Sequence, residues 1–175
     1  MVTNDFRAKE IGEDGQWVFG DLHTMCTRPH VHTELSHYPF SGKRAFIDPN
    51  TAGQYSGVKD KTETKIYSGD IIRYYDVKER CINPDCEPYN YIYEGVLIEK
   101  LSEVIFIDGM FCVEQEDGIS PIPISWLGLN DLKELREELN ATEENDFLDA
   151  DGNTIDETKI GIKVVGNIFD NPNLI

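Results

Sequence analysis

Short segments in which apolar and polar residues alternate recur along the chain, and turn signals separate them. The clearest pair is 103–107 and 110–114, which flank Asp108-Gly109. An Asp-Gly pair between alternating segments favours a type I′ turn, because both central residues of that turn need positive φ. The sequence therefore predicts a hairpin over 103–114, and the β-branched and aromatic segment 91–100 before it extends the hairpin to a three-stranded meander.

Other apolar segments predict further strands, at 16–19, 45–47, 71–75 and about 162–169. Gly95 inside the segment 91–100 predicts a β-bulge. Proline and charged residues predict a loop over 76–90 and an extended connector over 116–125.

One segment follows a helical pattern instead. Leu132, Leu135 and Leu139 are spaced at i, i+3 and i+7, and Asn130 is a suitable N-cap. The pattern predicts one substantial α-helix near 130–148. Short, closely spaced strands favour a small barrel or sandwich-like β fold, with an SH3-like meander in the second half. We expect a single domain over 1–175, or two β subdomains over about 1–70 and 71–175.

Charge is distributed unevenly along this fold. The chain of 175 residues has 33 acidic and 16 basic residues, a net charge of −17. Residues 1–75 hold 10 acids and 9 bases, whereas residues 76–175 hold 23 acids and 7 bases. An acidic surface repels phosphate and anionic lipid, so we expect no membrane partner, and nucleic acid is an unfavourable one.

The charge leaves two binding hypotheses open. The acidic second half could mimic DNA and occupy a host nucleic-acid-binding protein. The near-neutral first half could contact nucleic acid directly through its basic residues, which are Arg7, Lys9, Lys43, Arg44, Lys59, Lys61 and Lys65.

The sequence also bears on location. It has no run of about 18 apolar residues that could span a membrane, and its first residues lack the basic start and apolar stretch of a signal peptide. We expect a cytoplasmic protein of a bacterial host cell, with its four cysteines reduced.

Three blocks of sequence together resemble a known family. The first contains Phe6-Arg-Ala-Lys9 and Gly15-Gln-Trp-Val-Phe-Gly-Asp-Leu22. The second runs from Ile47 through Gly53-Gln-Tyr55 to Lys65-Ile-Tyr-Ser-Gly-Asp70, and the third is Val164-Val-Gly-Asn-Ile-Phe-Asp-Asn-Pro-Asn-Leu174. In this order they resemble the YopX family of bacteriophage and prophage proteins. The resemblance implies a largely β fold, a phage or prophage origin and self-association, and it implies no reaction.

Several residues are candidates for metal binding. His23, Cys26, His30 and His32 supply enough donors for a tetrahedral zinc ion, but their spacing fits no standard finger, and a variable loop with exposed histidines is the favoured interpretation. Cys81 and Cys86 could form half of another zinc site, without a second cysteine pair to complete it.

A calcium loop is a further candidate at Asp149–Asn153, where Gly152 falls at position 4 instead of the position 6 that an EF-hand needs. We therefore interpret this segment as a turn, and we predict no metal site in the chain. Cys112 is predicted to be a small apolar residue of the sheet.

Catalytic motifs are missing from the sequence, which has no nucleophile elbow, P-loop or HExxH. We predict no catalytic residue and no cofactor. Several aromatic residues could stack on single-stranded nucleic acid, but core packing or subunit contact is favoured for them; they are Tyr74, Tyr75, Tyr89, Tyr91, Tyr93 and Phe106.

The hypothesis that results is a non-enzymatic phage or prophage accessory protein. It would form a homo-oligomer and act by binding, with a host or phage protein as a further partner.

Overall fold

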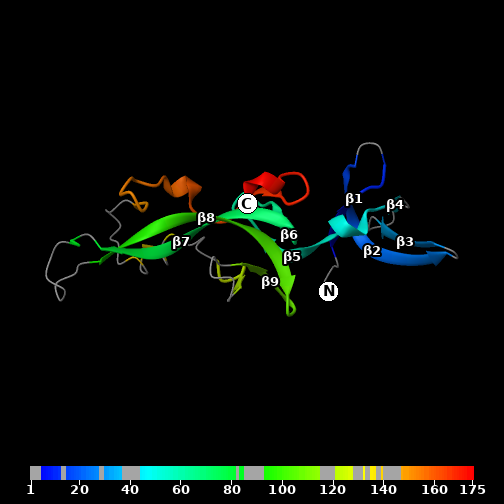
Figure 1. Cartoon of the computed structure of the whole chain (residues 1–175), viewed down its shortest axis with the longest axis horizontal. Coiled ribbons are helices and arrows are strands. Elements are labelled where there is room, and N and C mark those ends of the chain that lie inside the picture. Colours follow the sequence, from blue (N-terminus) through cyan, green and yellow to red (C-terminus); the bar gives the residue numbers. More distant parts are fainter. Residues whose placement is uncertain are drawn as a thin grey trace.

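Two antiparallel sheets make up the computed structural model of the chain (Figure 1). The structure describes residues 5–12, 15–27, 30–36, 44–81, 83–84, 93–114, 121–127, 132, 135–136, 139 and 147–175. The first group of strands lies at one end of the molecule, and the long strands of the second sheet extend toward the other end. The C-terminal residues lie between them, near the middle.

The first sheet has six strands, and it is built from residues 6–67. Across the sheet they follow the order β4 (Arg44–Phe46), β3 (His30–Ser36), β2 (Trp17–Thr27), β1 (Phe6–Lys9), β5 (Gly53–Lys59) and β6 (Lys65–Tyr67). A short 3₁₀ helix, η1 (Pro49–Thr51), precedes β5, and the Asp48 side chain caps it by accepting from the Asn50 N–H.

The second sheet has five strands, which run in the order β10 (Ile122–Pro123), β9 (Met110–Val113), β8 (Tyr93–Ile107), β7 (Asp70–Cys81) and β11 (Lys163–Asn167). Strand β11 comes from the carboxyl end of the chain and pairs with the start of β7. The 3₁₀ helices η2 (Glu157–Lys159) and η3 (Pro172–Leu174) flank β11 along the sequence.

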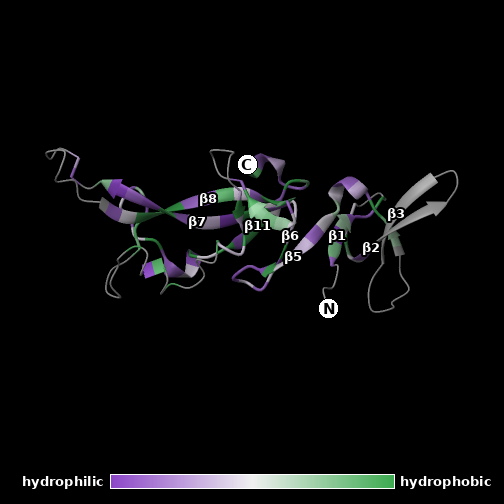
Figure 2. Cartoon of the chain, turned by 90° about the horizontal axis from the view of Figure 1, so that it is seen from below, coloured by the Kyte–Doolittle hydropathy of each residue, from purple (hydrophilic) through white to green (hydrophobic). Residues whose placement is uncertain are grey.

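The two faces of β7 supply two apolar cores. Tyr74 packs in a core with Val104, Val113 and Ile162, whereas its neighbour Tyr75 packs in another with Leu97 and Phe147. Successive residues of a strand point to opposite faces, so a run of apolar residues in β7 buries both sides of the sheet. Figure 2 shows hydrophobic residues gathered in the middle of the molecule around β11.

The predicted hairpin over 103–114 is confirmed. Ile107 pairs with Met110 and Val104 with Val113, so Asp108 and Gly109 are the two turn residues. Their φ angles are 50° and 84°, as a type I′ turn requires. Cys112 is buried in this hairpin, as predicted for a small apolar residue.

Several predicted boundaries are wrong because strands run further than the local pattern indicates. Segments 91–100 and 103–107 are not separate strands, since β8 is continuous from Tyr93 to Ile107 and the meander is β7-β8-β9. Residues 76–81, predicted as loop, extend β7. The loop predicted around the histidines is a hairpin of β2 and β3.

The predicted bulge at Gly95 is also wrong, because its pairing with Glu79 lies in an unbroken register. Gly95 instead makes room for another segment. A Cβ atom at this position would lie 2.4 Å from a methyl group of Leu139.

The prediction of a mainly β fold is confirmed, but the predicted small barrel is wrong. In the described part of the chain β4 and β6 end one sheet and β10 and β11 end the other, so neither sheet closes on itself. The two sheets are joined through β5 and the C-terminal segment, and the flanking segments cover the faces of β7. The division into subdomains at 70/71 stays a prediction.

No substantial α-helix has defined bounds within the described residues, which include little of the predicted segment 130–148. Its described residues Leu132, Leu135 and Arg136 are α-helical, and the Leu139 N–H donates to the Leu135 carbonyl at 3.0 Å. Leu135 is buried in the core of Tyr75, and Leu132 and Leu139 pack against that core. Within the described residues, no helix is long and apolar enough to cross a bilayer.

Candidate functional site

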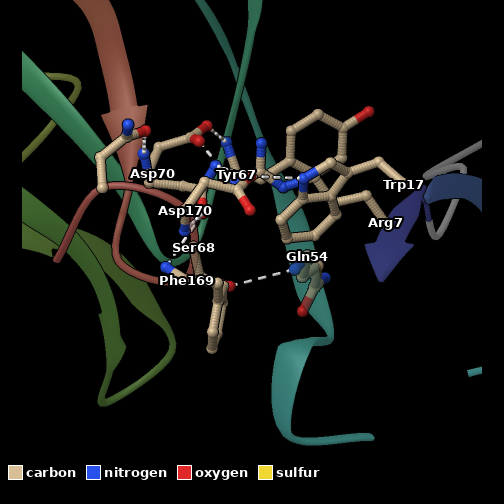
Figure 3. A network of polar contacts seen from close by, with 10 residues as sticks. Arg7, Trp17, Gln54, Tyr67, Ser68, Asp70, Phe169 and Asp170 are labelled. Carbon is tan, nitrogen blue, oxygen red and sulfur yellow. Dashed lines mark hydrogen bonds and ion pairs between the residues drawn. The ribbon is translucent and has the colours of Figure 1, made fainter. Parts of the chain in front are cut away.

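The three sequence blocks meet where the two sheets join (Figure 3). Arg7 of β1 donates to Asp70, the first residue of β7, at 2.5 Å. The second oxygen of Asp70 accepts from the backbone N–H of Tyr67 at 2.8 Å. The Asp70 side chain is only 1% exposed, so this is a buried ion pair between the first and second blocks.

The guanidinium of Arg7 lies between two aromatic rings. It is 4.7 Å from the ring centroid of Trp17 and 4.9 Å from that of Tyr67. The register of β1 and β2 explains this, because Arg7 pairs with Phe19 and Lys9 with Trp17, which places the four residues on one face. Cation–π contact adds to the ion pair at this junction.

The third block reaches the same place through Asp170. Its carboxylate accepts from the ammonium of Lys9, from the indole N–H of Trp17 at 2.8 Å and from the amide of Asn167 at 2.9 Å. These donors lower the pKa of Asp170 to about 2. Phe169 beside it packs on the Trp17 ring, with centroids 6.0 Å apart.

Backbone contacts join the blocks where side chains would not fit. Gly53 and Ser68 lie so close that a Cβ on Gly53 would be 2.4 Å from the Ser68 carbonyl oxygen. Gly69 has φ of 82°, donates to the Val104 carbonyl at 2.8 Å and accepts from the Ile168 N–H at 3.0 Å. Both glycines are therefore required by geometry.

Asp60 forms a second link between the second and third blocks. Its carboxylate accepts from the N–H groups of Thr62 at 2.7 Å, Thr64 at 2.9 Å and Val164 at 3.0 Å. Burial by itself would raise the pKa of Asp60, but these hydrogen bonds outweigh burial and hold the pKa below its ordinary value. The turn at 60–64 is thereby fixed to β11.

Burial dominates at the centre of the junction. It raises the pKa of Asp70 above its ordinary value, although the charge of Arg7 opposes the rise. Burial, with the nearby carboxylate of Asp5, also raises the pKa of Tyr67 to about 12. The phenol of Tyr67 therefore stays neutral at physiological pH.

Most of the basic residues proposed for nucleic-acid contact have partners within the chain. Arg7, Lys9 and Lys65 form ion pairs with Asp70, Asp170 and Asp5. Lys59 pairs with Glu63, and Lys61 donates to the carbonyl of Thr158 at 2.5 Å. Lys43 and the side chain of Arg44 lie outside the described residues. Five of the seven proposed residues thus have an acceptor within the chain, while the side chains of Lys59 and Lys65 are 46% and 45% exposed. Nucleic-acid contact stays a prediction.

The proposed aromatic platform does not form from its first two residues. Tyr74 and Tyr75 are buried on opposite faces of β7, in agreement with core packing, while Phe106 is exposed. Tyr89, Tyr91 and the side chain of Tyr93 lie outside the described residues.

The candidate zinc ligands lie in the β2–β3 hairpin. His23 pairs with Glu34, Cys26 with Val31 and His30 with Thr27, while His32 pairs with Met25. In β2 numbering the three histidines occupy register positions 23, 25 and 27, whereas Cys26 occupies position 26 between the last two. The side chains themselves are not described, so zinc binding here stays open to test. Cys86 is outside the described residues, and Cys81 ends β7 with a free thiol.

The Asp149–Asn153 segment forms the turn that its sequence predicts. One oxygen of its carboxylate accepts from the N–H groups of Asp151 at 2.9 Å and Asn153 at 2.8 Å, and the other accepts from the Asn153 amide at 3.0 Å. Asp149 therefore closes a turn, as predicted. No group of three or more His, Cys, Asp or Glu residues in the described part of the chain is placed to hold a metal ion.

Sequence reasoning missed that the three blocks meet and that their charged residues bind one another. The available signal was the opposite charge of the blocks, with Arg7 and Lys9 in the first and Asp70 and Asp170 in the other two. It gives no pairing, because the partners are separated by 63 and 161 residues.

Comparison with known proteins gives a family but no close relative. No curated protein and no solved structure matches the chain significantly. A family model described as YopX protein matches residues 5–175, which include all three blocks. The chain therefore belongs to the YopX family.

Proposed function

We propose that the protein is a non-enzymatic accessory protein of a phage or prophage that acts by binding, first of all to other copies of itself. Membership in the YopX family supports the phage setting. The observation that carries the proposal is the state of the acidic side chains in the three blocks. The carboxylates of Asp60, Asp70 and Asp170 are each held by several donors.

A general acid or base must be able to exchange a proton with a substrate. The hydrogen bonds of Asp60 and Asp170 instead hold both groups ionised, and Asp70 lies buried against Arg7. The residues that identify the family thus serve to fix one sheet against the other. We therefore assign the binding function to surfaces outside this junction.

Large apolar side chains on the surface support a role in binding. Phe106, Ile107, Met110 and Trp126 are all exposed, and none belongs to the three blocks. Exposed apolar groups of this kind are typical of protein contact sites.

The test is the oligomeric state in solution. Light scattering coupled to gel filtration, and sedimentation at several concentrations, would measure the mass of the particle. We expect a mass above 19.9 kDa that rises with concentration. A strict monomer at high concentration would exclude self-assembly.

A further inference from the structure

The tip of the β8–β9 hairpin is apolar on both of its faces. Phe106 and Phe111 pair across the strands with ring centroids 4.7 Å apart, and Ile107 pairs with Met110 on the opposite face. Phe106 is 52% exposed, Ile107 41% and Met110 50%. A hairpin normally buries one face and solvates the other with polar residues, so this tip departs from the usual pattern.

A second exposed group lies on the neighbouring strand. Strand β10 pairs with β9, and Ile124 just after it donates to the Phe111 carbonyl at 2.9 Å. Trp126 follows in the next turn and is 78% exposed. The tip residues and Trp126 are defined here as the tip surface, which consists of Phe106, Ile107, Met110 and Trp126.

The charge distribution indicates what this surface would contact. Asp108 is the only charged residue between Val104 and Val113, although residues 76–175 carry 23 acids against 7 bases. Two copies of a chain with net charge −17 repel one another wherever their carboxylates meet. The hairpin is a place in the acidic half where two copies can approach while bringing few like charges together. A basic partner would gain more by contacting the acidic surfaces beside it.

Strand addition is a poorer route to self-association. The described sheet edges are interrupted, because β10 contains Pro123 and the pairing of β11 shifts between Val164 and Gly166. Strand β6 has only three residues. Proline, bulges and short edge strands each hinder edge-to-edge pairing.

We propose that the tip surface is a contact by which two copies of this chain associate, an inference that rests on the self-assembly part of the proposed function. A large aromatic side chain presents roughly 150–250 Å², so the four exposed side chains together amount to roughly 400 Å² in each copy. This area is divided between the two faces of the hairpin, so a single contact covers only part of it. A stable interface takes about 800 Å² from each partner. The contact is therefore weak when it acts alone and depends on concentration.

The experiment compares the full chain with a double variant, Phe106→Ser with Met110→Ser, by sedimentation over a range of concentrations. The control is Ile11→Ser, because Ile11 is exposed (65%) but follows β1 and donates its N–H to Phe46 of β4, both in the other sheet. We expect the control to associate like the unaltered chain. We expect the double variant to associate at least tenfold more weakly, because the two substitutions truncate apolar side chains of the contact in each copy.

Circular dichroism establishes whether the double variant is folded. Should it not fold, Met110→Glu replaces it, since this position is half exposed and the added charge would face the same charge of the second copy across the contact. Added salt provides a second measurement, because screening of like charges should strengthen association of the unaltered chain.

The outcomes separate the two proposals. Association of the folded tip variant equal to that of the unaltered chain overturns the tip surface and leaves self-assembly standing. An unaltered chain that stays monomeric at every concentration overturns both.

Discussion

Replacing Arg7 with methionine tests whether the buried ion pair holds the two sheets together. The change keeps much of the apolar stem but removes the charge that faces Asp70 at 2.5 Å. Asp70 would remain as a carboxylate with 1% exposure and a single hydrogen bond, from the Tyr67 N–H. Leaving one partner of a buried pair without the other costs about 3–5 kcal/mol. We expect R7M to lower the free energy of unfolding by about that much at neutral pH.

A double-mutant cycle separates the ion pair from the packing. Asp70→Asn keeps an oxygen that can accept from Tyr67 but carries no charge, so D70N combined with R7M leaves no buried charge behind. The double variant should therefore be more stable than R7M by about 1–3 kcal/mol. Urea unfolding followed by circular dichroism measures all four proteins, and Trp17 fluorescence reports on the junction itself because its ring contacts Arg7.

The pH dependence gives an independent check of sign. Burial already raises the pKa of Asp70 in the folded chain, so the folded state binds more protons than the unfolded state between the two pKa values. Stability from this group is then present at low pH and falls as pH rises through the folded pKa. Loss of Arg7 raises that pKa further, so R7M should lose more stability than the unaltered chain as pH rises above the ordinary pKa of a carboxyl group. A cost below 1 kcal/mol for R7M, with no added pH dependence, would refute the assignment of the pair.

Three further predictions concern other points of the fold. Asp170→Asn should lower the free energy of unfolding by about 1 kcal/mol at neutral pH, after allowance for the 39% exposure of Asp170. The difference should vanish as pH falls toward 2, because the folded pKa of about 2 lies below the ordinary 3.8, and unfolding measured over a series of acidic pH values would show it. Gly53→Ala should lower the stability measured by thermal unfolding by about 1–3 kcal/mol, because the new methyl group meets the Ser68 carbonyl. Gly12→Ala is the control, since a methyl group there has open space, and equal effects of the two substitutions would contradict the close approach at Gly53. Gly109→Val should destabilise the hairpin by about 1–3 kcal/mol because of its φ of 84°, and unchanged hydrogen exchange at Phe111 would count against a strained turn there.

Local pattern predicts local structure in this chain. The hairpin at Asp108-Gly109 could be predicted because the turn residues and the flanking alternation lie within twelve residues. The hairpin of β2 and β3 could not, because residues 23–36 combine histidine, threonine and glutamate without a repeated apolar face, and Pro29 interrupts them. Its strands are held by backbone pairing over seven residue pairs, and such pairing leaves no period in the sequence.

The junction of the two sheets shows a different limit of prediction from sequence. The family blocks were visible in the sequence, and their glycines indicated tight backbone geometry, but the pairs that join them depend on the completed fold. Leucines 132, 135 and 139 illustrate the converse case. Their spacing predicts helical turns, which Leu132 and Leu135 adopt, and the fold adds what the spacing could not give, namely the core around Tyr75 and Leu97 against which they pack.

The pairing also gives the charge of the first half a physical meaning. Residues 1–75 are nearly neutral, with 10 acids and 9 bases, and this balance by itself leaves a phosphate contact open. In the fold, however, Arg7, Lys9 and Lys65 are matched by Asp70, Asp170 and Asp5, so their charges are cancelled at short range. The partner of Lys9, Asp170, belongs to the acidic half, so this ion pair neutralises one of its carboxylates where the sheets meet. Residues 76–175 hold 23 acids against 7 bases, so most acidic residues of that half have no basic partner from the same half. A partner that recognises this protein by charge would therefore be basic, while copies of the chain would meet with least repulsion through uncharged surface such as the proposed hairpin tip.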